Sequence, residues 1–184
     1  MTKLTLLTIS GALRQASTNR LLLAEAARVF GPARVIDADL RFPLYDEDIE
    51  NGPGIPPHVQ ALADQIAAAD AVVISTPEYN SGLSGVLKNA LDWISRTKTR
   101  PWRDKPVAIL SAADGRAGGA RSQFSLRLCL NPFRPRLLTG PEVLVANSRD
   151  AFDAEGRLKE PRYTASLTEL MQALRVEAMR SKSQ

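Results

Sequence analysis

Apolar residues change their spacing repeatedly along the chain, and these changes predict alternating strands and helices. Period-2 or continuous apolar runs predict strands at 4–9, 33–37, 70–75 and 105–111, with a broken fifth strand at 136–138 and 142–146. Spacing near 3.6 residues predicts helices at 18–30, 57–69, 84–96, 118–130 and 161–180. The stretch 42–57 is dense in Pro, Gly and Asp, so it is predicted to be a loop or short turns.

This alternation predicts an α/β fold with a parallel sheet. Right-handed crossovers leave few arrangements, and the length favours a flavodoxin-like three-layer sandwich, a five-stranded parallel sheet in the order 2-1-3-4-5. No repeat or linker divides the sequence, so residues 1–184 are predicted to form a single domain. In this arrangement ligands bind beyond the carboxyl ends of the strands, which directs attention to the loops after the first, third and fourth strands.

Composition narrows the setting of the protein. With one cysteine, Cys129, a disulfide scaffold is excluded, and a lone thiol fits a reducing compartment. No apolar run reaches the roughly 20 residues that a membrane span needs. We therefore expect a cytoplasmic protein without a membrane partner. The formal net charge of +4 suits anionic ligands, whereas 5% aromatic residues give little support for nucleic-acid binding.

The loop after the first strand carries a candidate phosphate site. It runs from Ser10 to Asn19 and leads directly into a helix. Ser17, Thr18 and Asn19 are favourable N-cap residues, and a helix N-terminus presents free N–H groups to an anion. Arg14 adds a positive charge. Because neither a dinucleotide glycine fingerprint nor a phosphate-binding P-loop is present, a single phosphate is the expected anion.

The loops after the third and fourth strands are suited to a flat heterocycle. Pro77, Glu78, Tyr79 and Asn80 follow the third strand and combine a stiff turn, an aromatic face and an amide. After the fourth strand, glycines at 115, 118 and 119 strip side chains from the loop, so that a ring can lie against backbone.

The usual catalytic side chains are missing. His58 is the only histidine and begins a helix, and with one His and one Cys a zinc site is not expected. The acidic cluster of Asp46, Glu47, Asp48 and Glu50 lacks calcium-loop spacing and is expected to be solvated. A phosphate pocket, a flat-ring pocket and no catalytic side chain together favour a bound cofactor that carries the chemistry, such as flavin mononucleotide (FMN).

Three motifs resemble the NADPH-dependent FMN reductase family, in the branch that includes quinone, chromate and azo reductases. They are Gly11-Ala-Leu-Arg14-Gln-Ala-Ser17-Thr-Asn19, Pro77-Glu-Tyr-Asn80 with Ser84-Gly-Val-Leu-Lys-Asn-Ala-Leu-Asp-Trp93, and Gly115 to Arg121. The resemblance runs from the first strand to the last, and the second motif is the most specific.

The resemblance implies roles for individual residues. Arg14, Ser17, Thr18 and Asn19 would hold the FMN phosphate, Pro77 to Asn80 would border the isoalloxazine ring, and Ala113 to Gly115 would meet it through backbone groups. Ser10 completes the cofactor-binding set, and no residue is assigned as catalytic. Lys88, Asn89, Asp92 and Trp93 are interpreted as structural. A homodimer or homotetramer is implied, with Glu78, Tyr79 and Arg121 as candidate contacts between subunits.

Three features depart from the family pattern. Ala12 replaces the usual serine, which removes one phosphate hydroxyl worth roughly 1 kcal/mol. Ser84 replaces a frequent proline, and the segment Asn131–Pro135 has no counterpart that we can place.

The implied reaction passes a hydride from NADPH or NADH to FMN, after which a small-molecule acceptor takes two electrons. The acceptor could be a quinone, free flavin, an azo compound or chromate, and Arg116 and Arg121 could draw anionic acceptors or the 2′-phosphate of NADPH. Two alternatives stay open: a flavin-free nucleoside-processing transferase with Glu78 as nucleophile, and a non-catalytic FMN-binding protein. A signalling receiver of the same fold is disfavoured because Ser10 and Ser75 stand where it needs carboxylates.

Overall fold

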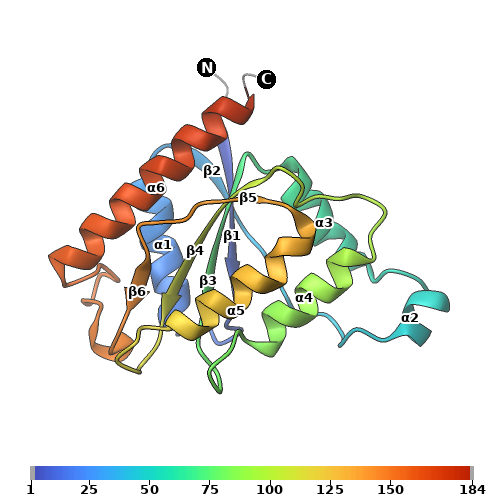
Figure 1. The fold of residues 1–184 in the computed structure, drawn as a ribbon, viewed down its shortest axis with the longest axis horizontal. Coiled ribbons are helices and arrows are strands. Elements are labelled where there is room, and N and C mark those ends of the chain that lie inside the picture. Colours follow the sequence, from blue (N-terminus) through green and yellow to red (C-terminus); the bar gives the residue numbers. More distant parts are fainter. Residues whose placement is uncertain (1–2, 183–184) are drawn as a thin grey trace.

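A parallel sheet lies at the centre of the computed structural model, which describes residues 3–182 (Figure 1). Within that range six strands form the sheet: β1 (Leu4–Ser10), β2 (Ala33–Asp37), β3 (Ala71–Thr76), β4 (Pro106–Ala112), β5 (Arg136–Leu137) and β6 (Val143–Val145). The order is β2-β1-β3-β4-β5, and β6 also pairs with β4. The predicted flavodoxin-like order 2-1-3-4-5 is therefore confirmed.

The fifth strand is broken as predicted. β5 pairs with the beginning of β4, at Pro106 and Val107, and β6 pairs with its end, from Leu110 to Ala112. Both pieces occupy the same edge of the sheet, and every pairing in the sheet is parallel. The end of β6 therefore reaches the carboxyl edge, next to the end of β4.

Helices cover both faces of the sheet. Figure 1 shows α1 (Thr18–Phe30) and α6 (Pro161–Lys182) on one side, and α3 (Pro57–Ala68), α4 (Gly85–Ser95) and α5 (Ala120–Leu130) on the other. Side chains that alternate along each strand fill two separate cores; Leu6 packs under α1 and α6, whereas Leu7 packs under α3 and α4. Sheets covered on both faces show such continuous apolar strands.

One helix boundary differs from the prediction for a clear reason. α5 begins at Ala120 rather than 118, because Gly118 and Gly119 adopt left-handed backbone, with φ of +58° and +94°. A Cβ atom on Gly118 would lie 2.6 Å from the backbone of Leu144. The sequence pattern could not separate these glycines from the helix that follows them.

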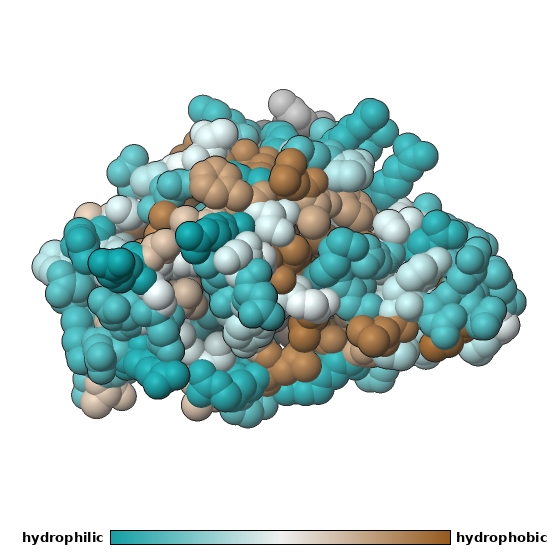
Figure 2. Space-filling view, turned by 60° about the horizontal axis from the view of Figure 1, so that its bottom comes forward, coloured by the Kyte–Doolittle hydropathy of each residue, from teal (hydrophilic) through white to brown (hydrophobic). Residues whose placement is uncertain are grey.

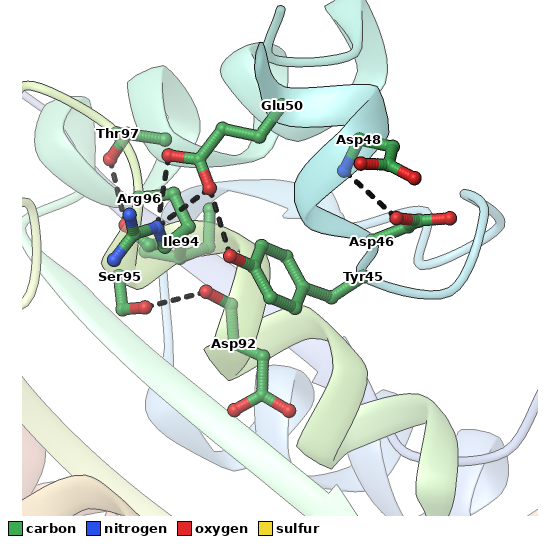
Figure 3. A network of polar contacts seen from close by, with 9 residues as sticks. All are labelled: Tyr45, Asp46, Asp48, Glu50, Asp92, Ile94, Ser95, Arg96 and Thr97. Atoms are coloured by element: carbon green, nitrogen blue, oxygen red, sulfur yellow. Dashed lines mark hydrogen bonds and ion pairs between the residues drawn. The ribbon is translucent and has the colours of Figure 1, made fainter.

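The segment predicted as a loop contains a short helix, α2 (Glu47–Asn51), which stands apart from the other helices in Figure 1. Asp46 caps this helix by accepting a hydrogen bond from the N–H of Asp48. Glu50 accepts hydrogen bonds from the Tyr45 hydroxyl and from Arg96 at the end of α4 (Figure 3). The expectation of a wholly solvated acidic cluster is therefore wrong for Glu50.

The same segment is fastened to α4 by the residues of the second motif. The side chains of Asn89 and Trp93 both donate hydrogen bonds to the carbonyl of Pro43, at 2.9 and 2.8 Å, and Asn89 accepts one from the N–H of Tyr45. Lys88 pairs with Asp92 one turn away. These contacts confirm the structural interpretation of that part of the motif. We call the contacts of 43–50 with α4 the clasp.

Candidate functional site

A cavity of about 720 Å³ opens at the carboxyl edge of the sheet, between the loops after β1, β3 and β4. We call it the carboxyl-edge cavity. The predicted site residues that line it are Arg14, Ser17, Thr18, Asn19, Pro77, Glu78, Tyr79, Asn80, Ala113 and Gly115. Figure 2 brings the lower end of Figure 1 forward, where these loops lie, and this face is mainly hydrophilic with separate hydrophobic patches.

Ser10 is not among the residues that line the cavity. Its hydroxyl donates to the carbonyl of Ala12 and accepts from the N–H of Ala12, so it closes the turn that follows β1. Ala12 itself is 5% exposed and does not line the cavity either. A serine at position 12 would therefore have its hydroxyl in a buried part of this turn.

The N-terminus of α1 faces the cavity. The Ser17 side chain caps the helix by accepting from the N–H of Asn19 at 3.2 Å, and Thr18 is the first helical residue. The N–H groups of Arg20 and Leu21 donate to the carbonyl of Ser17, so within residues 3–182 the N–H of Thr18 is the free donor of the first turn. The helix dipole gives this end a partial positive charge. Arg14 is exposed in the loop beside it. This geometry suits a phosphate.

Asn19 has a different task from the one expected of it. Its side-chain amide donates to the carbonyl of Ala112 at 2.9 Å, and its oxygen accepts from the Ser75 hydroxyl and the N–H of Ala112. The residue is 2% exposed. Asn19 thus ties α1 to the ends of β3 and β4, and fixes the spacing of the three loops.

The loop after β3 is a tight hairpin that projects at the cavity rim. Tyr79 and Gly82 exchange two backbone hydrogen bonds, and the residues between them, Asn80 and Ser81, have φ of +48° and +63°. Positive φ at both central positions is typical of a type I′ turn, which asparagine tolerates well. Tyr79 is 58% exposed, so its ring is free to contact a ligand.

Glu78 connects this hairpin to α5. Its carboxylate accepts hydrogen bonds from the N–H groups of Arg121 and Ser122 and pairs with the Arg121 guanidinium at 3.3 Å. Because the N-cap position is Gly119, which has no side chain, Glu78 supplies the cap from another loop. A carboxylate held in this way is poorly placed to act as a nucleophile, which disfavours the transferase alternative.

The loop after β4 offers less free backbone than expected. The N–H of Ala113 donates to Val145, and its carbonyl accepts from Ser148, so both groups are already paired. At Gly115, by contrast, an added Cβ atom would meet nothing within 4 Å. Gly115 lines the cavity, and a side chain there would have free space around it.

Sequence reasoning missed a contribution from the segment after β6. Ser148 lines the cavity, accepts from the Thr18 hydroxyl at 3.2 Å and donates to Asp114 at 3.0 Å. Arg149 pairs with the other oxygen of Asp114 at 2.7 Å. No local pattern announces these residues, because they reach the cavity through the pairing of β6 with β4.

Four arginines line the cavity, and they differ in their partners. Arg121 pairs with Glu78, and Arg149 pairs with Asp114. The side chains of Arg14 and Arg116 make no ion pair with any residue in 3–182. These two are the cations available to a bound anion.

Residues 3–182 contain no group of three or more His, Cys, Asp or Glu side chains placed to hold a metal ion, and His58 is exposed. In the same range no helix combines the length and the apolar character that crossing a bilayer requires.

Comparison with known proteins matches most of the chain. Residues 4–150 match the family model described as NADPH-dependent FMN reductase. A protein named NAD(P)H-dependent FMN reductase from Pseudomonas aeruginosa is 44% identical over 170 residues, which cover 91% of each chain. The chain belongs to the NADPH-dependent FMN reductase family. A quinone reductase from Escherichia coli K12 is 39% identical over 145 residues, 77% of each chain.

Solved structures agree with this family assignment. The flavoenzyme NAD(P)H:(acceptor) oxidoreductase FerB from Paracoccus denitrificans superposes with a TM-score of 0.85 at 26% identity, covering 96% of this chain and 97% of that one. The predicted family and fold are therefore confirmed, and with them the class of enzyme, an oxidoreductase. Membership in this family also favours a flavoenzyme over the nucleoside-processing transferase.

Proposed function

We propose that this protein uses bound FMN to transfer two electrons from NADPH or NADH to a small-molecule acceptor, with a quinone as the first candidate. The observation that carries the proposal is the carboxyl-edge cavity, which combines a helix N-terminus, an unpaired arginine and an open wall at Gly115. Its volume of about 720 Å³ falls within the range of roughly 300–1,000 Å³ that is typical of cofactor sites.

The residues present fit FMN from one end to the other. Arg14, Ser17 and the first turn of α1 would bind the phosphate, and the hairpin with Tyr79 would border the ring. Gly115 would leave room for the ring. Bound FMN supplies the two-electron chemistry, which explains why the cavity needs no acid–base pair of its own.

The protein's own contribution is to position the three loops and to exclude water from part of the cavity. Asn19 holds the strand ends together, and Glu78 fixes the hairpin against α5. The first turn of α1 and nearby backbone N–H groups provide positive potential, which favours a ligand that gains negative charge. Such fixed dipoles need no rearrangement when the charge develops.

The electron acceptor that we propose first is a quinone. The names of the relatives favour a quinone, while free flavin, azo compounds and chromate are further candidates. We also propose a cytoplasmic location, in keeping with the free thiol of Cys129.

A homodimer or homotetramer is supported by an apolar stripe on α5. Phe124 and Leu128 lie four residues apart on one side of the helix and are 61% and 70% exposed. Large exposed apolar side chains that lie side by side favour a contact surface. Glu78 and Arg121, expected to join subunits, pair with each other within one chain. Light scattering on the purified protein measures the assembly directly.

Anaerobic titration tests the function. FMN-loaded protein is mixed with NADPH or NADH, and the flavin absorbance near 450 nm is expected to bleach and then return when a quinone is added. If the protein binds FMN but neither NADPH nor NADH bleaches the flavin absorbance, it is the non-catalytic FMN-binding protein. Return of the absorbance with azo dyes or chromate ranks the other acceptors.

A further inference from the structure

A second cavity lies at the opposite end of the sheet. Its volume is about 510 Å³, and its walls come from the end of α4 (Ile94 and Ser95), from 97–103 before β4 and from 132–134 before β5. We call it the amino-edge cavity. Residues 132–134 belong to the Asn131–Pro135 segment that has no counterpart in the family pattern.

The walls of this cavity are strongly basic. Lys98, Arg100, Arg103 and Arg134 all line it, and no aspartate or glutamate does. Arg103 makes one ion pair, with its neighbour Asp104 at 3.8 Å, and both side chains are more than half exposed. The side chains of the other three make no hydrogen bond or ion pair with any residue in 3–182.

These basic side chains are not needed as hydrogen-bond donors to the backbone carbonyls at the nearby helix ends. α4 and α5 both end beside this cavity, and basic side chains often bind the free carbonyls of such ends. Carbonyls at both helix ends are already paired within the chain, since Ile94 accepts from the Thr97 hydroxyl, and Arg127 and Leu128 accept from the N–H of Asn131. All four basic side chains are exposed, so their mutual repulsion in water is modest, and an anion placed among them would relieve it.

The walls are held in place by backbone contacts. The N–H of Arg103 donates to the carbonyl of Arg100, and the N–H of Arg134 donates to Asn131. The carbonyl of Arg134 accepts from the N–H of Asp104, which joins the two segments. The backbone of both segments is therefore fixed before a ligand binds, and the cost of ordering is confined to the exposed basic side chains.

The side of the cavity nearest the core is aromatic. Trp102 is 3% exposed and Phe133 is partly buried, and both line the cavity. The volume is within the range of small-molecule sites and exceeds the space that one phosphate requires. Guanidinium groups bind phosphate through paired N–H donors, which is why arginine predominates at such sites.

We propose that the amino-edge cavity binds a small phosphate-bearing polyanion, with at least two anionic groups placed between Arg100 and Arg134. The site is separate from the carboxyl-edge cavity and does not depend on the proposed reaction. Pyrophosphate is the simplest probe of this chemistry, and ADP is the probe for a ligand that adds a flat ring.

The test is a calorimetric titration of the full chain loaded with one equivalent of FMN and freed of excess, so that the carboxyl-edge cavity is occupied and the amino-edge cavity is not. Pyrophosphate is expected to bind saturably, at one per chain. Arg100→Ala/Arg134→Ala is expected to weaken binding about tenfold or more, because each charged hydrogen bond contributes strongly. The control variant Arg162→Ala/Arg180→Ala removes the same net charge from α6 and is expected to bind as the wild type does.

Three outcomes would overturn the proposal: no saturable binding, equal weakening in both double variants, or binding of an acidic peptide but not of pyrophosphate. If ADP binds more tightly than pyrophosphate and Phe133→Ala removes the difference, the proposal holds and the ligand is a nucleotide. Equal affinities support a site that recognises the phosphates alone.

Discussion

The carboxyl-edge cavity and the amino-edge cavity lie at opposite ends of one sheet, and each is lined by four basic side chains. In the first, two arginines are paired with Glu78 and Asp114, and the N-terminus of α1 adds partial positive charge. In the second, no carboxylate is present, and two helices end rather than begin there.

The difference concerns how each site is held together. Buried polar bonds between distant elements build the carboxyl-edge cavity, as in the contacts of Asn19 with β3 and β4. The amino-edge cavity rests mainly on short-range contacts within its own turns, such as that of Thr97 with Ile94. We infer that the first is coupled to the stability of the whole fold and that the second is coupled more weakly.

The largest expected effect comes from Asn19→Ala. This change leaves the Ser75 hydroxyl and both backbone groups of Ala112 without their partner, and such buried groups cost about 3 kcal/mol together. Urea unfolding measures the loss. The comparison variant is Thr97→Ala, which removes the local contacts of one hydroxyl with the carbonyls of Ile94 and Thr99 and is expected to cost about 1 kcal/mol. Equal losses in the two variants would contradict the distinction between the cavities.

Next in size is Arg14→Ala. The loss of an unpaired cation beside the α1 N-terminus is expected to weaken FMN binding about tenfold, or about 1.4 kcal/mol, while the fold persists. Fluorescence titration with FMN gives the dissociation constant. Arg100→Ala removes the same charge from the other cavity and is expected to leave FMN affinity unchanged. If Arg14→Ala binds FMN as the wild type does, the phosphate is not held there.

A smaller effect is expected from Arg116→Gln. Because Arg121 is occupied by Glu78, Arg116 is the remaining rim cation for the 2′-phosphate of NADPH. We expect kcat/KM for NADPH to fall about fivefold, since an exposed charge pair contributes up to about 1 kcal/mol. NADH lacks the 2′-phosphate and serves as the control in the same assay. A parallel fall with both nucleotides would point to a general loss of binding.

The smallest effect concerns the clasp, next to the amino-edge cavity. The hydrogen bond from Arg96 lowers the pKa of Glu50 below its ordinary value of 4.5. The ionised carboxylate therefore stabilises the fold above that value, and this contribution is lost as pH falls through the lowered pKa. Thermal melts of wild type and Glu50→Gln should differ slightly at neutral pH and converge in acid. Divergence in acid would contradict this.

The sequence was sufficient for features that depend on local pattern. The apolar run of β3 and the cap of α1 are visible in residues close together, and the strand order follows from the alternation of strands and helices. These features bring the three loops to one edge, so the cavity was predictable. The family motifs added the identity of its occupant, which physical reasoning alone had limited to a flat ring with one phosphate.

Features that depend on distant contacts were not predictable. Glu78 caps a helix that begins 42 residues later, and Ser148 reaches the cavity through β6. Asn19 has a side chain that suits phosphate binding, but its amide donates a hydrogen bond to the carbonyl of Ala112 in β4. α2 has five residues, which are too few to show a helical period of apolar positions. Its local signal in the sequence is the capping residue Asp46.

The central claim is that FMN occupies the carboxyl-edge cavity, and Gly115→Leu tests it most directly. A Cβ atom at this position projects into open space, so a leucine fits the fold and fills room that the cofactor needs. Gly115 lines the cavity, so in an FMN titration of cofactor-stripped protein we predict one FMN per wild-type chain and at least about tenfold weaker binding by a stably folded Gly115→Leu. Equal affinity in the two proteins, or no FMN uptake by the wild type, would contradict the account.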